Sequence, residues 1–401
     1  MKKLRPGTIL PLLSLAAFAL GLILGLTAPG FFAPISFIGT VYLNLLKLIV
    51  IPLLMAEVAV GVYRAGASAP GQLIRTVALF AVMFVISFLL TAGLVSLLRP
   101  GVGMELFGGE WDGSAAVMSP GTFFESIFPA NLFAAMSAGS MLPCLLFAFV
   151  FGTAAGSVRA EKLMDAVDEF RAVCTKILSY IMWLTPPGVF SLIGSAAAGY
   201  GAALLGVCAR YILTAWLGCL VVTVLVMILP VWLFCGITPI RYIRSVAPVW
   251  LLTLSTCSSA ATLPTTLRVC HEEFGIPERI TGVVVPLGCT IHMCGGAVSF
   301  CLLGLFTLQM AGASVTLPLF LQMLLVATLM NMAAPGIPGG GVALGAAYLG
   351  ILGAPGGFIG LYSGVYRLLD MAYTSVNVTG DITANLLLAE NEKRKEPTER
   401  V

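Results

Sequence analysis

The chain has 401 residues, of which 59% are hydrophobic and only 10% charged, and its mean hydropathy is +1.02. Ordinary soluble domains carry roughly 25% charged residues, so this composition excludes a water-soluble globule and predicts an integral membrane protein. The formal net charge of +3 is small and spread along the chain, which argues against a nucleic-acid-binding surface. The ten cysteines stand singly in apolar stretches, so we expect reduced, buried thiols rather than a disulfide framework.

Eight apolar stretches are long enough to cross a bilayer, since a spanning helix needs roughly 20 apolar residues. The first follows Lys2, Lys3 and Arg5 and is longer than the ~7–15 apolar residues typical of a signal peptide, so we interpret it as a spanning helix. In chain order the predicted spans cover residues 9–28, 34–63, 74–98, 129–156, 172–193, 202–236, 280–311 and 356–389.

Two further apolar segments contain helix breakers. Residues 246–270 are interrupted by Ser258, Ser259 and Pro264, and residues 320–350 by a run of prolines and glycines. Non-helical backbone at membrane depth is tolerated only where protein or a water-filled cavity satisfies its polar groups. Both segments therefore predict re-entrant hairpins.

The distribution of basic residues supports this topology. With eight spans and two hairpins that each return to their own side, nearly all Lys and Arg residues fall on one side, and Arg99 stands almost alone on the other. Loops rich in Lys and Arg face the cytoplasm, so we expect a multi-pass protein of the cell (inner) membrane with both termini cytoplasmic. Residues 101–119 would form a polar external loop and residues 391–401 a charged tail.

Polar residues follow one face of the last predicted helix. Arg367, Asp370, Thr374, Asn377 and Asp381 are spaced 3, 4, 3 and 4 residues apart, which places them on one helical face. Ionisable residues inside a membrane cost about 2.5–3.5 kcal/mol each on insertion scales and are commonly functional. The pattern predicts the wall of a substrate and ion cavity. The alternative is a buried structural network in which Arg367 pairs with Asp370.

The two hairpins carry groups that such a cavity needs. Residues 255–264 combine small hydroxyl residues with a Leu-Pro step that predicts a tight tip, where free amides and hydroxyls could hold a carboxylate. The alternative is a helix contact through small residues. Residues 333–341 contain too many breakers for a packed helix, and their carbonyls could coordinate a small cation. Interrupted segments in two successive hairpin-plus-helix units are typical of a transporter site near the middle of the bilayer.

Two titratable residues within the predicted spans are candidate proton sites. His292 fits either a satisfied core residue or a proton carrier. Its spacing from Cys289 and Cys294 does not converge like that of a Cys/His zinc site, so we predict no zinc centre. For Glu57, a neutral hydrogen-bonded side chain is favoured over a proton relay.

Taken together, six motifs resemble those of the dicarboxylate/amino acid:cation symporter family, the relatives of the glutamate transporters. They extend over nearly the whole chain, and only their combination is specific. The motifs are LNLLKLIVIPLLMAEVAVGV at 43–62, MWLTPPGVFSLI at 182–193, SSAATLPTTLR at 258–268, VPLGCTIHMCGGA at 285–297, GIPGGG at 336–341 and DMAYTSVNVTGD at 370–381.

The resemblance implies an all-α membrane fold of eight transmembrane helices and two re-entrant hairpins, which works as an elevator and is usually a homotrimer. Residues 1–72 and 119–200 would form a scaffold of helices 1, 2, 4 and 5. Residues 73–118, with helix 3 and the external loop, and residues 201–390, from helix 6 through both hairpins to helix 8, would form the mobile transport domain. Residues 391–401 would be the cytoplasmic tail.

The resemblance also implies roles for single residues. Asp370 would hold the α-amino group of an amino acid. Asn377 and Thr374, with Ser258 and Ser259, would hold its α-carboxylate, and the second hairpin around residues 334–339 would act as the gate. The predicted substrate-binding residues are Ser258, Ser259, Gly296, Ile337, Gly339, Asp370, Tyr373, Thr374 and Asn377. The predicted sodium ligands, mostly backbone groups, are Gly288, Thr290, Asn331, Ala334, Asn377 and Asp381.

Two departures from the family pattern favour a neutral substrate. Members that carry acidic substrates have an arginine where this chain has Tyr373, and a threonine where it has Gly296. A buried substrate carboxylate without a bidentate partner would be strongly disfavoured. We therefore expect a small neutral amino acid such as serine, threonine or alanine. Arg367, one turn before Asp370, keeps an acidic amino acid or dicarboxylate as the alternative.

The cation positions depart from the family pattern as well. Family members read Asn-Met-Asp-Gly-Thr where this chain reads His-Met-Cys-Gly-Gly at 292–296, and polar third-span positions correspond to Met83 and Phe84. A hard cation needs oxygen ligands, so at most the sodium sites around Asp381 and the second hairpin would remain. The sequence therefore predicts fewer sodium ions per cycle, or proton coupling through one of the two candidate proton sites.

Two other classes of protein fit the sequence less well. A channel or anion-conducting pore would need a continuous polar lining, whereas the polar residues gather at one depth. In an intramembrane enzyme Asp370 and Asp381 would have to meet, but eleven residues of helix separate them by roughly 16 Å, too far to share a proton. We expect a symporter without enzyme activity, with sodium as coupling ion and no other cofactor.

Overall fold

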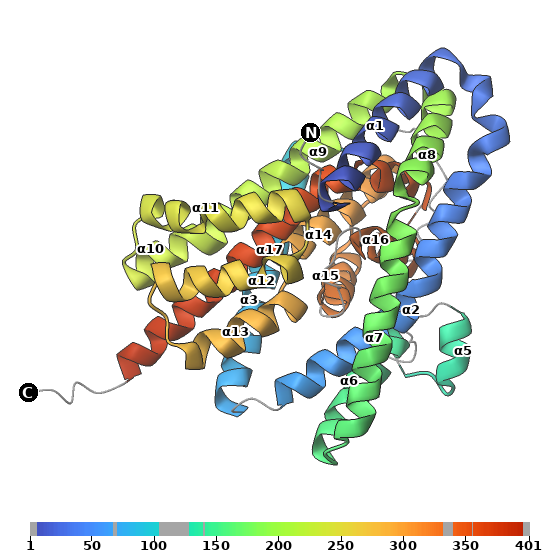
Figure 1. The fold of residues 1–401 in the computed structure, drawn as a ribbon. Coiled ribbons are helices and arrows are strands. Elements are labelled where there is room, and N and C mark those ends of the chain that lie inside the picture. Colours follow the sequence, from blue (N-terminus) through green and yellow to red (C-terminus); the bar gives the residue numbers. More distant parts are fainter. Residues whose placement is uncertain are drawn as a thin grey trace, which may run out of the picture.

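The computed structural model describes residues 6–66, 70–103, 128–138, 141–331, 340–354 and 356–395. These residues form helices joined by short turns, and no β-strand occurs among them. Helices from distant parts of the sequence pack side by side around the long last helix (Figure 1).

The first half of the described chain contains the helices that were expected to form the scaffold, together with the third predicted span, which was expected to belong to the transport domain. They are α1 (Pro6–Thr27), the short 3-10 turns η1 (Pro29–Phe31) and η2 (Ala33–Ile35), α2 (Ser36–Gly66), α3 (Pro70–Leu98), α5 (Leu132–Ser137), α6 (Met141–Ser157), α7 (Glu161–Met182) and α8 (Thr185–Tyr200).

The second half contains both predicted hairpins and the helices around them. Its elements are α9 (Ala203–Val222), the π-helix η4 (Thr223–Ile228), α10 (Leu229–Cys235), α11 (Pro239–Thr256), α12 (Ser259–Arg268), the π-helix η5 (Val269–Glu273), α13 (Glu278–Ile291), α14 (Cys294–Met310), α15 (Leu317–Asn331), α16 (Gly340–Ile351), the 3-10 turn η6 (Gly356–Phe358) and α17 (Ile359–Lys395).

Among the described residues, three helical stretches are long and apolar enough to cross a membrane: Ile74–Leu98, Ala203–Cys235 and Glu278–Met310. The number rises to five if each of two bent helix pairs counts as one span; the bends are 118° between the α1 and α2 segments and 53° between α7 and α8. These apolar helices support a multi-pass membrane protein. The count of eight spans stays a prediction.

Several predicted spans are not single straight helices. The fourth, 129–156, corresponds to the two helices α5 and α6, and the fifth bends where α7 ends and the Pro-containing first turn of α8 begins. The seventh is interrupted at His292 and Met293, whose backbones are not helical. Apolar composition alone could not indicate this last break, because both residues fit an apolar window. The last helix continues beyond the predicted residue 389 to Lys395.

Helices α1, α2, α6, α7 and α8 pack on one another and form one group. Glycines allow the close approach of α8 to α1 and to the turns η1 and η2. A Cβ built on Gly21 would lie 2.7 Å from the carbonyl oxygen of Phe190, and one built on Gly194 would fall on the ring of Phe32. Small residues permit such close helix packing in membranes.

The second group is centred on α14 and α17. Nearly every residue of α14 is buried, and the helix packs between α3 and α17. The predicted hairpins correspond to the pairs α11–α12 and α15–α16, and all four of these helices contact α14 or α17. The tip of the first hairpin lies at Cys257 and Ser258, because Cys257 has a left-handed backbone with φ of 51°. The expected Leu-Pro step, Leu263–Pro264, lies instead inside α12.

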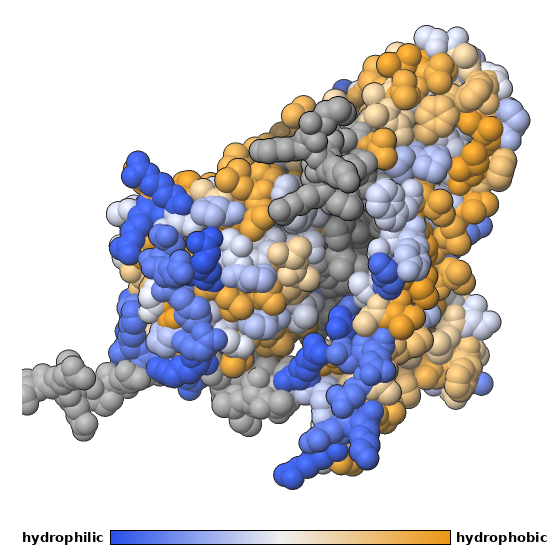
Figure 2. All heavy atoms as spheres, in the orientation of Figure 1, coloured by the Kyte–Doolittle hydropathy of each residue, from blue (hydrophilic) through white to orange (hydrophobic). Residues whose placement is uncertain are grey.

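Charged side chains gather at the ends of α6 and α7 and at the ends of the helices around α10 to α13, whereas the rest of the visible face is largely hydrophobic (Figure 2). Arg171 of α7 contacts Asp168 at 2.7 Å and Glu57 of α2 at 3.4 Å, and Arg64 also reaches Asp168 at 2.7 Å. Glu57 therefore has a hydrogen-bond partner, as expected, in a guanidinium from a segment 114 residues away in sequence, and its neutral state stays a prediction.

Candidate functional site

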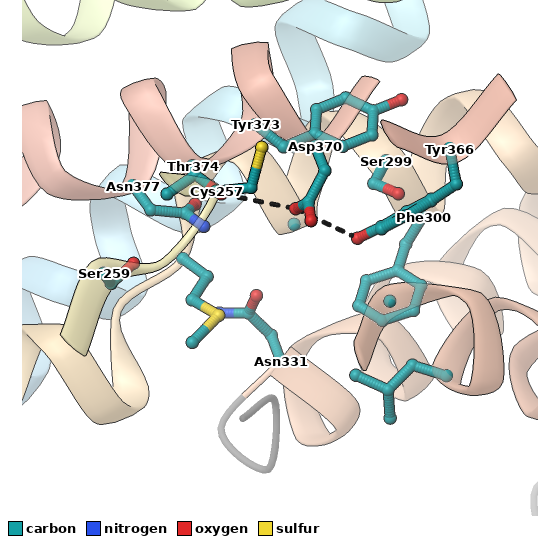
Figure 3. A pocket seen from close by; sticks show the side chains of 14 residues that line it. Cys257, Ser259, Ser299, Phe300, Asn331, Tyr366, Asp370, Tyr373, Thr374 and Asn377 are labelled. Atoms are coloured by element: carbon teal, nitrogen blue, oxygen red, sulfur yellow. Dashed lines mark hydrogen bonds between the residues drawn. The ribbon is translucent and has the colours of Figure 1, made fainter. Parts of the chain in front are cut away.

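A cavity lies where the first hairpin, the break before α14, the second hairpin and α17 meet (Figure 3). Each of these elements contributes at least one polar or small residue to its wall. The lining residues are Cys257, Ser259, Met293, Gly296, Ser299, Phe300, Asn331, Gly341, Leu344, Tyr366, Asp370, Tyr373, Thr374 and Asn377. The polar stripe predicted from helical spacing therefore forms one wall of this cavity from Asp370 to Asn377.

Asp370 is the acidic residue of that wall. The residue is 6% exposed, and its Oδ1 accepts hydrogen bonds from Thr374 Oγ1 at 3.3 Å and from the Tyr366 hydroxyl at 3.4 Å. Both donors are four residues away, on the same helical face. The bonds orient the carboxylate, and Figure 3 shows it facing the cavity.

Arg367, one turn before Asp370, contacts the first hairpin. Its guanidinium donates a hydrogen bond of 3.0 Å to the carbonyl oxygen of Ser255, near the end of α11. The described residues that line the cavity include no arginine and no lysine. Among the described residues, the cavity is therefore lined by the carboxylate of Asp370 but by no cationic side chain.

The two serines at the first hairpin tip have different positions. Ser258 is the N-cap of α12, and its side-chain oxygen accepts a hydrogen bond from the backbone N–H of Ala261 at 3.2 Å. Such a cap satisfies one of the free amides at the start of a helix. Ser259, the first residue of α12, lines the cavity.

The backbone just after the break in the seventh predicted span holds the side chain of Asn377 in place. The backbone N–H of Gly295, in the first turn of α14, donates a 2.7 Å hydrogen bond to Asn377 Oδ1. Gly295 can lie this close to α17 because it has no side chain: a Cβ there would fall on the carbonyl oxygen of Tyr373.

The side chain of Tyr373 is directed so that its hydroxyl points away from the Asp370 carboxylate (Figure 3). The ring of Tyr373, rather than its hydroxyl, therefore faces the groups on this wall.

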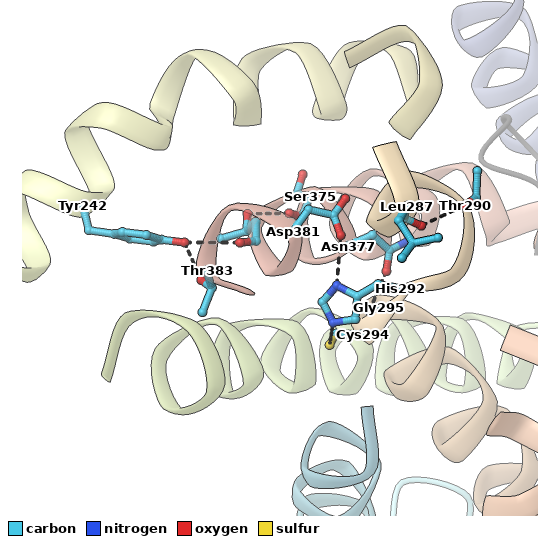
Figure 4. Close-up of polar contacts among 11 residues, drawn as sticks. Tyr242, Leu287, Thr290, His292, Cys294, Gly295, Ser375, Asn377, Asp381 and Thr383 are labelled. Atoms are coloured by element: carbon cyan, nitrogen blue, oxygen red, sulfur yellow. Dashed lines mark hydrogen bonds and ion pairs between the residues drawn. The ribbon is translucent and has the colours of Figure 1, made fainter. Parts of the chain in front are cut away.

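The expected sodium position at Asp381 contains a histidine. Nδ1 of His292 lies 2.9 Å from Asp381 Oδ1, and both side chains are almost completely buried (Figure 4). On the other side of the ring, Nε2 lies 3.1 Å from Cys294 Sγ. The ring of Phe80 from α3 stacks on the imidazole, with 4.2 Å between centroids.

The other predicted ligands around Asp381 also have protein partners. The Gly288 carbonyl accepts a bond from the backbone N–H of His292 at 2.9 Å, and the Thr290 hydroxyl donates to the carbonyl of Leu287 at 2.8 Å. Hard cations bind where several oxygen atoms converge. Each of these two oxygens still has a lone pair, because the hydroxyl donates its hydrogen bond and the carbonyl accepts only one. The role of Gly288 and Thr290 as sodium ligands stays a prediction.

Of the predicted residues in the second hairpin, Asn331 lines the cavity, whereas Ala334, Ile337 and Gly339 lie outside the described residues. Sequence reasoning did not single out Tyr366, although it lies one turn before Asp370 on the same stripe. Its distance of four residues from Asp370 is a helical repeat that could have found it, although the 3-4 pattern continued backward from Arg367 reaches Ser363 instead. The other unpredicted lining residues carry no such signal, since they are small or apolar residues of buried helices: Cys257, Met293, Ser299, Phe300, Gly341 and Leu344.

The chain is similar to transport proteins over most of its length. It is 29% identical, over 89% of its length and 85% of the relative, to a proton/glutamate-aspartate symporter of Escherichia coli (strain K12). It is 28% identical, over 93% of each chain, to a proton/sodium-glutamate symport protein of Bacillus caldotenax. It is 28% identical, over 97% of its length and 81% of the relative, to the neutral amino acid transporter B(0) of Oryctolagus cuniculus.

These relatives are transporters and not enzymes, which confirms the prediction of a transport protein. A sequence model described as the sodium:dicarboxylate symporter family matches residues 10–391. The chain therefore belongs to the sodium:dicarboxylate symporter family.

Proposed function

We propose that this family member is a secondary active symporter that imports a small neutral amino acid, similar to serine, threonine or alanine, together with sodium. The observation that carries the proposal is the cavity wall itself: it presents the Asp370 carboxylate and the Asn377 carboxamide, and its described lining contains no cationic side chain. An amino acid zwitterion needs an anionic group and neutral donors a few ångströms apart. This wall supplies both.

The roles within the site follow from charge and position. Asp370 would bind the substrate ammonium group through a charge-assisted hydrogen bond. Thr374, Ser259 and the amide group of Asn377 would bind the carboxylate. The Asn377 oxygen already accepts from Gly295, which leaves its NH₂ group as the donor. Ser258 would act indirectly, by capping the helix that begins with Ser259.

An acidic substrate is the second candidate, because several relatives carry glutamate or aspartate according to their names. A second substrate carboxylate would need a cationic partner in the cavity. Arg367 is the nearest such residue in the sequence, but its guanidinium bonds to the hairpin carbonyl of Ser255. Burying an unpaired carboxylate is strongly unfavourable, so the neutral amino acid is preferred.

Sodium as coupling ion is supported by the family and by the sodium-glutamate relative. The hydrogen bonds around Asp381 argue that this position does not bind sodium while His292 occupies it. We propose that at most one sodium ion is carried per cycle, at the second hairpin near Asn331. Sodium and proton gradients imposed separately would decide between this version and coupling to protons alone.

The transport movement that we propose is of the elevator type. The group of α1, α2, α6, α7 and α8, within residues 1–72 and 119–200, would be the scaffold. The group around α14 and α17, from residues 73–118 and 201–390, would carry the cavity across the membrane. We further propose a homotrimer in the inner membrane with cytoplasmic termini.

The proposal can be tested by reconstitution into liposomes with a panel of radiolabelled amino acids and dicarboxylic acids. Sodium-driven uptake of small neutral amino acids, without uptake of glutamate or succinate, is the expected result. Uptake of dicarboxylates alone would refute the assigned substrate. Uptake that is unchanged without external sodium would refute sodium coupling while leaving the substrate assignment intact.

A further inference from the structure

Two residues that line the cavity have a buried polar atom without a hydrogen-bond partner in the described part of the chain: Tyr373, whose hydroxyl points away from the Asp370 carboxylate, and Asn331. Asn331, the last residue of α15, is 3% exposed, and its carboxamide oxygen is both buried and unpaired there. Figure 3 shows this oxygen pointing from α15 into the space below the α17 wall. Leaving a buried acceptor without a donor is costly, so we expect a molecule that enters the cavity to supply the donor.

Gly296 makes room for this oxygen. A Cβ built on Gly296 would fall on Asn331 Oδ1, so that any side chain at position 296 would displace the carboxamide. The two residues come from different helices, α14 and α15, and meet only in the folded chain. The carboxamide of Asn331 therefore occupies the space that a side chain at position 296 would fill.

The surroundings of the carboxamide are mostly apolar. Met293, Phe300 and Leu344, from the break before α14, from α14 and from α16, line the same cavity, whereas Asp370 and Asn377 belong to α17. A substrate whose ammonium and carboxylate groups lie on α17 would direct its side chain toward α14, α15 and α16. There it would meet a small apolar subsite with one hydrogen-bond acceptor.

We propose that Asn331 is a specificity-determining residue whose carboxamide oxygen accepts a hydrogen bond from the substrate side chain. Among small neutral amino acids the protein would therefore select those with a hydroxyl group, serine and threonine, over alanine and valine. This inference rests on the proposed function. It also gives the side chain of Asn331 a role different from that of a sodium ligand, which was the expectation from the sequence.

The experiment compares matched substrate pairs as competitors of radiolabelled serine uptake in liposomes. Serine should bind about tenfold or more tightly than alanine, and threonine than valine, because an analogue without the hydroxyl leaves the acceptor unpaired. In Asn331→Leu both ratios should fall to about one, whereas Asn331→Asp keeps an acceptor oxygen and should retain the preference. Gly296→Ala, which displaces the carboxamide without removing it, should also lower the ratios.

The control is Gln322→Leu, which removes another buried carboxamide of α15 that does not line the cavity. It should leave both ratios unchanged. Equal binding of serine and alanine by the unaltered protein would overturn the role of Asn331 but not the proposed function. A uniform loss of affinity for all four amino acids in Asn331→Leu, with a raised sodium requirement, would identify a sodium ligand and overturn the inference. Uptake of acidic substrates alone would overturn the proposed function itself.

Discussion

The sharpest test of the cavity is Asp370→Asn, which removes a charge and keeps the shape of the side chain. Asp370 is 6% exposed and receives hydrogen bonds from Thr374 and Tyr366. If a substrate ammonium group binds here, the substitution leaves that charge without its buried partner. Breaking a buried charge pair costs about 3–5 kcal/mol, which corresponds to an apparent affinity lower by roughly 10²- to 4 × 10³-fold.

The assay for this variant is the shift in melting temperature of the detergent-purified protein on adding serine, together with uptake in liposomes. The melting temperature without substrate shows whether the variant is folded. Glu272→Gln is the matched control, because it removes a carboxylate that is 64% exposed and pairs with Arg268 at 3.6 Å, outside the cavity lining. An apparent affinity of Asp370→Asn within about threefold of the unaltered protein, where a loss above 10²-fold is expected, would refute the role of Asp370.

Three further substitutions test the surroundings of the cavity. His292→Asn removes the imidazole from Asp381, so we expect the dependence of uptake on sodium concentration to steepen as the freed carboxylate gains an ion; an unchanged curve would contradict this. Gly295→Ala places a Cβ on the Tyr373 carbonyl and should lower the free energy of unfolding by about 1–3 kcal/mol, visible as a lower melting temperature. Arg171→Ala removes two ion pairs, with Glu57 and Asp168, whose groups are partly exposed, so the loss in the free energy of unfolding should be only about 1 kcal/mol and smaller at high salt. A larger loss that salt does not change would contradict the last expectation.

The face of α17 could be predicted from the sequence because a helix has a fixed repeat. Once the segment around Asp370 is taken as helical, the spacing to Thr374 and Asn377 places all three on one side. The structure has these residues on one wall of the cavity. The helical repeat does not determine which residues of other helices face that wall. The hydrogen-bond partner of Arg367 could not be predicted either, because it is a backbone carbonyl 112 residues away and every residue has such a carbonyl.

Breaks within apolar segments were harder to predict than breaks that contain prolines and glycines. The prolines and glycines at 333–341 predict a break from composition alone. The break at His292 and Met293 could not be predicted in this way, because both residues fit an apolar span. What favours the break is tertiary: His292 bonds to Asp381, and the amide of Gly295 bonds to Asn377. Both partners are on α17, far along the chain. A prediction from a short stretch of sequence uses only local preferences, whereas this break is stabilised by hydrogen bonds to residues far along the chain.

The short segment 292–295 joins the cation position to the substrate wall. At its first residue the imidazole is held by Asp381, and at its last the backbone N–H holds Asn377, which is one helical turn before Asp381 on α17. Only two residues lie between the imidazole and the amide of Gly295, so we expect a displacement of one to affect the other. If a cation displaces His292 from Asp381, we expect the orientation of the Asn377 carboxamide to change with it. Coupling between ion and substrate then requires no long pathway, because both ends of this segment bind the same face of one helix.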